Sequence, residues 1–282
     1  MVQSQPNLVG ASQANKGLRM FSTTAINSFY GYFKAGVQKV AKKQGLVTGF
    51  LGKDLDPLLK LRCRIDYQGQ EHIPSKGPYL IAINHLRNEE GFLRAIYDAF
   101  AVSWIFYQKR KVNIRWIGRL NQNRDTMHLG VPGFGRFMPM PFGASLANMF
   151  ERKYGALLIK EEDLGKSKHL TIKKTIQCLQ AGQVVGLAPE GDLQYELSKA
   201  KRGVYYIAKG CLEQGIETPV IPIAVWWDKR KIFFRRRQMQ IRIAPSLRID
   251  PLQPAQAEAD RVMIEIAKLL PEQYRGYYKE YV

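Results

Sequence analysis

Short apolar runs alternate with segments of helical spacing along most of the chain. Over residues 61–67 apolar and polar side chains alternate and Gly69 follows, which predicts a half-buried strand. Continuous apolar runs predict four buried strands, over residues 79–83, 156–159, 184–188 and 220–225. Apolar residues at helical spacing separate these runs, as over 172–179. The alternation predicts a sheet layered with helices, in which strand ends supply the functional site.

An apolar stripe marks the N-terminal region. From residue 16 to residue 41, apolar side chains recur every three or four positions, and Lys34 and Lys42 fall on the opposite side. This pattern predicts an amphipathic helix, which either lies in a membrane interface or packs on the core of the protein itself. The preceding residues are polar and acid-free, and we expect them to be disordered. The expected organisation is a leader, an amphipathic membrane-associating extension and an α/β domain, over residues 1–15, 16–60 and 61–282.

The charge of the chain is high and segregated. Its 282 residues include 43 Lys and Arg against 24 Asp and Glu, a formal net charge of +19. Residues 1–53, 109–124 and 229–242 contain 20 basic side chains and no acidic ones, so the rest is nearly neutral. This segregation favours an anionic partner, either phospholipid head groups or nucleic acid, over a merely solubilising surface. No run reaches the roughly 18 apolar residues that a bilayer span needs.

One segment carries candidate chemistry. His85 follows the apolar run 79–83, and Glu89 and Glu90 lie four and five positions further on. A carboxylate beside a histidine fixes the ring tautomer and stabilises imidazolium, so that the other ring nitrogen can accept a proton from a hydroxyl. The sequence has no G-x-S-x-G elbow, P-loop or H-E-x-x-H motif. The pair therefore suggests direct attack by a bound alcohol, although an isolated histidine near two glutamates is also common on surfaces.

Four sequence blocks, in order, resemble the glycerophospholipid acyltransferases of the lysophosphatidic acid acyltransferase type. Asn84-His85 with Glu90 matches the N-H-x-x-x-x-D motif, and Pro189-Glu190-Gly191 matches the start of P-E-G-T-R. The other two blocks are a counterpart of the second motif that ends at Lys160, and a proline-containing strand that includes Pro222. The resemblance extends from about residue 65 to residue 225. It implies an αβα sandwich around a mixed sheet, with N-terminal helices that dock on membrane.

The resemblance also implies a reaction, the transfer of an acyl group from acyl-CoA or acyl carrier protein to a lysophospholipid hydroxyl. In that scheme His85 is the general base and Glu90 its partner, and no metal or redox cofactor is required. Asn84, Lys160, Glu190, Gly191 and Pro222 are the expected substrate-binding residues, with Lys160 at the acceptor head group. The expected product is phosphatidic acid, made from 1-acyl-glycerol-3-phosphate by a peripheral enzyme on the cytoplasmic face of an anionic membrane.

The chain departs from the family pattern at three points, which affect the acceptor most. Glu90 replaces Asp, Lys160 replaces Arg, and Asp192-Leu193 replaces the Thr-Arg of the third motif. The missing arginine normally helps to hold the acceptor phosphate, and Lys199, Lys201 or Arg202 are possible substitutes.

Three readings therefore stay open at this point. The acceptor is either lysophosphatidic acid or a less charged lysolipid. In the second reading, the chain is a non-catalytic relative that binds lipid. In the third, it is a nucleic-acid-binding protein whose basic and aromatic segment 226–237 stacks bases. We do not expect a nucleic acid partner.

Overall fold

The computed structural model describes residues 49–86, 92–120, 150–160, 168–228 and 237–282. Its strands are β1 (Cys63–Gln68), β2 (Tyr79–Ile83), β3 (Ile114–Leu120), β4 (Leu157–Lys160), β5 (Val184–Leu187), β6 (Val220–Trp227) and β7 (Arg237–Ile243). Its α-helices are α2 (Leu51–Asp54), α3 (Asp56–Arg62), α4 (Phe92–Arg110), α6 (Lys168–Gln180), α7 (Gly203–Leu212) and α8 (Ala255–Leu269). Short 3-10 helices are η1 (Gln70–His72), η3 (Glu272–Tyr274) and η4 (Gly276–Tyr281). None of the helices in these ranges is long and apolar enough to span a bilayer.

Within the described ranges, seven strands form one mixed sheet in the order β1-β7-β6-β2-β5-β3-β4. β6, β2, β5, β3 and β4 run parallel to one another, and β7 pairs antiparallel with β6. β1 pairs parallel with β7, so these two strands run opposite to the other five. The central pair, β2 and β5, therefore has both of its carboxyl ends at the same edge of the sheet.

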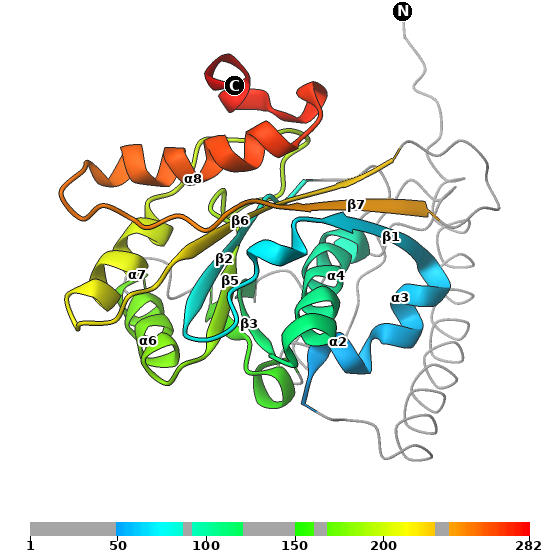
Figure 1. The fold of residues 1–282 in the computed structure, drawn as a ribbon, viewed down its shortest axis with the longest axis horizontal. Helices are drawn as coiled ribbons and strands as arrows, with labels where there is room; N and C mark the ends of the chain where they lie inside the picture. The colour runs from blue at the N-terminus through cyan, green and yellow to red at the C-terminus, as the bar shows by residue number, and fades with distance from the viewer. Residues whose placement is uncertain (1–48, 87–91, 121–149, 161–167, 229–236) are drawn as a thin grey trace, which may run out of the picture. The chain divides into compact units, whose positions relative to one another are not determined.

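Helices cover both faces of the sheet (Figure 1). Successive side chains of β2 alternate between two apolar cores: Leu80 and Ala82 pack with α6, α7 and α8, and Ile81 packs with α3 and α4. A strand that is buried on both faces has to be apolar at every position, which accounts for the uninterrupted run 79–83. The layered α/β architecture and the mixed sheet confirm the predicted αβα fold.

The strands that the sequence predicted are all present, with small shifts at their ends. The expected strand over 61–67 begins at Cys63, because Leu61 and Arg62 complete α3. Gly69 ends it in the left-handed region, at φ +81, where glycine is favoured. The sequence reading missed β3 and β7, whose residues include Arg115, Arg119 and Arg242 among the apolar positions.

The region before β1 packs on the sheet domain. Leu51 is 2% exposed, and a Cβ on Gly52 would come within 2.2 Å of the backbone oxygen of Ser103 in α4. Leu59 of α3 belongs to the same core as α4. The amphipathic stripe over 16–41 and the leader over 1–15 lie outside the described residues.

Candidate active site

Two motif blocks that are more than a hundred residues apart meet at the carboxyl edge of the sheet. Asn84 and His85 follow β2, and Glu190 and Gly191 follow β5, which is its parallel neighbour. Leu86 forms an isolated parallel bridge with Gln194, so the two segments continue side by side beyond the strands. Adjacent parallel strands end at the same edge, which is where α/β proteins usually place their ligands.

The carboxyl group of Glu190 links the two segments. One oxygen accepts a hydrogen bond from the backbone N–H of His85 at 2.7 Å, and the other accepts one from the N–H of Ser198 at 3.1 Å. The side chain is 1% exposed. Burial raises the pKa of Glu190 from 4.5 to about 7, against the lowering effect of the two N–H donors. Glu190 thus fixes the backbone that carries His85, a contact that the motif alone did not indicate.

His85 is held through its backbone, and its ring is the candidate reactive group. Its carbonyl accepts a long hydrogen bond of 3.4 Å from the N–H of Gln194. Its Nδ1 atom is buried and has no hydrogen-bond partner among the residues that the structure describes. Burial lowers the pKa of His85 to about 4, so the ring is neutral at pH 7. A neutral imidazole is the protonation state that a general base requires.

Asn84 connects β2 to β6. Its Nδ2 donates to the carbonyl of Val225 and its Oδ1 accepts from the N–H of Val225, both at 2.7 Å. The side chain is fully buried. The carboxamide continues the β2–β6 ladder past its last backbone pair, Ile83 with Ile223. In this arrangement Asn84 sets the direction in which the chain leaves β2 toward His85.

A Lys–Asp pair lies over the turn that follows Glu190. Gly191 adopts φ +72, a left-handed conformation that glycine tolerates best. A Cβ at this position would lie 2.7 Å from Nζ of Lys201. That ammonium contacts Asp192 at 2.6 Å, and both side chains are exposed. The positive charge nearest to this turn in the described part of the chain therefore comes from Lys201, one of the three substitutes considered above.

The remaining candidates lie elsewhere or outside the described residues. Lys160 ends β4, which is three strands from β2 and hence ~14 Å away at the usual spacing of about 4.8 Å. The side chain of Lys160 and both Glu89 and Glu90 fall outside the described parts of the chain. Pro222 is buried within β6, opposite Ala82, and its carbonyl accepts a hydrogen bond from Ala244 at 2.9 Å. These assignments stay predictions.

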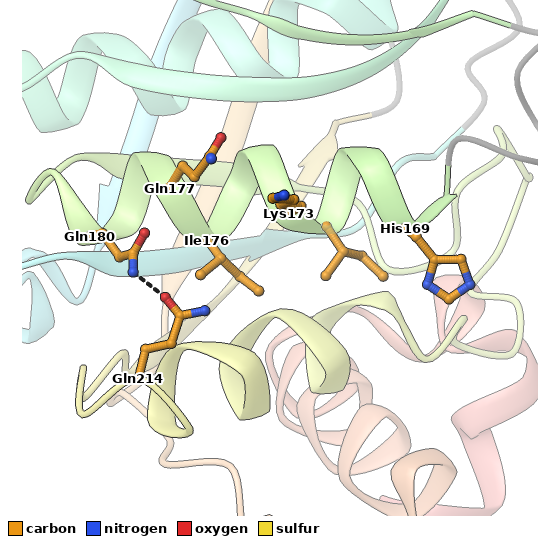
Figure 2. Close-up of a pocket in the computed structure, with 7 residues that line it drawn as sticks. His169, Lys173, Ile176, Gln177, Gln180 and Gln214 are labelled. Carbon is orange, nitrogen blue, oxygen red and sulfur yellow. Dashed lines mark hydrogen bonds between the residues drawn. The ribbon is translucent and has the colours of Figure 1, made fainter.

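A hollow of about 240 Å³ opens between α6 and α7 (Figure 2). Two isoleucines form its apolar part, and Gln180 donates a hydrogen bond to Gln214 at one end. The lining residues are His169, Ile172, Lys173, Ile176, Gln177, Gln180 and Gln214. None of them belongs to a sequence motif, so the candidate chemistry stays with His85.

The fold and the site define an α/β protein whose candidate reactive group is a neutral histidine where the parallel strands end. The family model Acyltransferase matches residues 64–226, more than half of the chain. The chain therefore belongs to the Acyltransferase family, which confirms the resemblance seen in the motifs. The matched range contains Asn84, His85, Lys160, Glu190 and Pro222.

Among solved structures, the chain is similar to the crystal structure of the 1-acyl-sn-glycerophosphate (LPA) acyltransferase PlsC from Thermotoga maritima. The identity is 16% and the TM-score is 0.46, and the match covers 84% of this chain and 86% of that one. No curated protein matches the sequence significantly.

Proposed function

We propose that this acyltransferase moves a fatty acyl group from acyl-CoA or acyl carrier protein to the free hydroxyl of a lysophospholipid. The first candidate for the acceptor is 1-acyl-glycerol-3-phosphate, which would give phosphatidic acid. The observation that supports this proposal most is the neutral ring of His85, with Nδ1 buried and without a partner among the described residues. Membership of the Acyltransferase family supplies the reaction class.

In the proposed step, the acceptor hydroxyl attacks the thioester carbonyl carbon while Nε2 of His85 removes its proton. The tetrahedral intermediate then expels the thiolate, which takes the proton from the imidazolium. The products are the new ester and the free thiol, and His85 returns to its neutral form. Glu190 keeps the backbone of His85 in place throughout, because its carboxyl group accepts the His85 N–H.

The proposed partner of Nδ1 is Glu90. Burial alone leaves His85 with a pKa of about 4, which makes it a weak base at pH 7. A carboxylate next to Nδ1–H favours the imidazolium and raises this pKa toward the working range. Glu90 is the acid position of the motif, and Glu89 is the second candidate.

The spacing of the strands favours Lys201 over Lys160 as the group that meets the acceptor phosphate. In 1-acyl-glycerol-3-phosphate the phosphate is attached to the carbon next to the one that bears the free hydroxyl. The phosphate therefore has to bind near His85, whereas Lys160 is three strands away. Lys201 lies over Gly191, and its pairing with Asp192 is a contact that a phosphate can replace.

The enzyme is proposed to act as a peripheral protein on the cytoplasmic face of an anionic membrane. The six Lys and Arg residues among residues 1–48, with no acid, support electrostatic attraction to such a surface. The amphipathic pattern over 16–41 supports an apolar contribution to the same binding.

Thiol release from an acyl thioester, measured over a panel of lysophospholipids, tests the proposal. We expect release only with an acceptor present, and fastest with 1-acyl-glycerol-3-phosphate. Lys201→Ala should raise KM for that acceptor and leave KM for the thioester unchanged, with exposed Lys268→Ala as the matched control. A clear preference for a zwitterionic lysolipid, unaffected by Lys201→Ala, would contradict the acceptor assignment. Absence of transfer to every acceptor would contradict the function.

A further inference from the structure

The segment between Glu190 and α7 has little regular structure, yet its backbone is hydrogen-bonded on two sides. We call residues 192–201 the site loop. On the inner side, the N–H of Ser198 donates to Glu190, and the N–H of Lys201 donates to the carbonyl of Pro189 at 2.8 Å. The inner side of the loop thus holds the carboxyl group that fixes His85.

On the outer side, the site loop contacts the residues that follow α8. The N–H of Leu197 donates to the carbonyl of Tyr274 at 2.9 Å, and its carbonyl accepts from the N–H of Tyr277 at 2.8 Å. Gly276 lies between them at φ +45, where a Cβ would come within 2.3 Å of the Leu197 oxygen. Only glycine fits this close approach, so the contact is specified by the sequence.

Three side chains enclose the peptide groups of Ala200. The Tyr278 hydroxyl accepts a hydrogen bond from the N–H of Ala200 at 2.8 Å and donates one to Asp260 at 2.6 Å. Nε2 of Gln256 donates to the carbonyl of Ala200 at 2.9 Å and to the same Asp260 oxygen at 3.0 Å. Tyr278 is fully buried. The result is a closed ring of hydrogen bonds around a single residue of the site loop.

We propose that Tyr278 is a positioning residue for acyl transfer, because it holds Ala200, and through the site loop Ser198, Glu190 and the backbone of His85. The inference rests on the proposed function of His85. Apart from the isolated bridge between Leu86 and Gln194, the site loop pairs with no strand of the described sheet, so its place depends on that bridge and on the contacts above. A shift of about 1 Å in a reacting group is enough to reduce turnover about 100-fold.

Tyr278→Phe tests the proposal, because it removes the two hydrogen bonds of the hydroxyl and keeps the buried ring. Tyr205→Phe is the matched control: Tyr205 is also buried, and its hydroxyl donates to the carbonyl of Pro251 at 2.9 Å, which lies outside the site loop. Turnover and residue-resolved amide hydrogen exchange are measured in both variants at temperatures well below unfolding.

We expect Tyr278→Phe to lower kcat at least about 10-fold with KM for the thioester unchanged, and Tyr205→Phe to stay within about 2-fold. Exchange should accelerate at the amides of Ser198 and His85, but not in β6. A kcat equal to that of Tyr205→Phe, or exchange that rises equally throughout the fold, would overturn the proposal. Hydrogen exchange can be measured even if the protein shows no acyl transfer, so it tests the positioning role of Tyr278 independently of the proposed function. If Tyr278→Phe does not fold, Gln256→Ala should give the same pattern with smaller changes.

Discussion

At the scale of single residues, the protonation of Glu190 is tied to the stability of the fold. Its pKa is raised from 4.5 to about 7, so the folded state binds this proton more tightly than the unfolded state. The resulting stability is present below pH 4.5 and is lost as the pH rises through 7, an effect of ~3 kcal/mol. The same carboxyl group accepts hydrogen bonds from the backbone N–H groups of His85 and Ser198.

Glu190→Gln should remove this dependence. Between pH 4.5 and pH 8, the free energy of unfolding of the wild type should fall by ~2 to 3 kcal/mol more than that of the variant. Urea unfolding at several pH values measures the difference. Glu196→Gln, an exposed change on the site loop, should follow the wild type. An unchanged slope in Glu190→Gln would show that Glu190 does not titrate over this pH range in the folded protein.

A second prediction at this scale concerns the partner of His85. If Glu90 raises the pKa of His85, then Glu90→Gln should move the acid limb of the kcat–pH profile to lower pH by about one pH unit or more. The same variant should also lower kcat, because the ring loses its orienting partner. Glu89→Gln should leave the limb in place. The reverse result for the two variants would transfer the partner role to Glu89.

At the scale of the elements, Asn84 is where β2 is joined to β6 beyond the backbone ladder. Asn84→Ala leaves two buried backbone groups of Val225 without partners, which should cost ~2 to 4 kcal/mol in the free energy of unfolding. Urea unfolding measures this loss.

Asn113→Ala is the matched control. Asn113 also forms one backbone hydrogen bond through Oδ1 and one through Nδ2, but its side chain is only half-buried. It should lose less stability and keep its activity. Equal stability losses in the two variants would contradict the importance assigned to the buried position.

Sequence patterns predict the central strand β2 well, but they predict β7 and β3 poorly. β2 matches its prediction residue for residue, because burial on both faces makes the whole run apolar. β7 begins within a basic stretch. It pairs with β6 and β1, and the local sequence pattern does not indicate which strands a segment will pair with. β3 is likewise interrupted by arginines.

The site was predictable to the extent that motifs encode it. His85 and Glu190 follow strands that the sequence predicted, so their meeting at one edge follows from parallel pairing. The contacts of Tyr278 and Gln256 with the site loop depend on how α8 and the segment after it pack against that loop. Their residues carry no motif, so sequence reasoning had no signal for them.

At the scale of the whole molecule, the charge segregation predicts salt-sensitive membrane binding through the N-terminal region. Because Leu51 and Gly52 pack on α4, a deletion that tests this has to stop at residue 48. Removal of residues 1–48 takes away six basic side chains, each worth about 1 kcal/mol at an anionic surface.

This deletion should release the protein from anionic vesicles at moderate salt and leave the sheet domain folded. Co-sedimentation with vesicles and thermal unfolding measure the two effects, with neutral vesicles and single-stranded DNA as comparisons. Vesicle binding that persists unchanged would show that the N-terminal region is not the membrane contact. Tighter binding of the full chain to DNA than to vesicles at equal salt would favour a nucleic acid partner.

The central claim is that His85 performs acyl transfer as the general base, and the turnover of His85→Ala tests it most directly. General-base catalysis contributes ~100- to 10,000-fold to the rate, so kcat of the variant should fall at least ~100-fold. Its unfolding temperature should stay close to that of the wild type. His169→Ala, an exposed histidine of α6, should retain wild-type turnover. A folded His85→Ala protein with near-normal turnover would contradict the account.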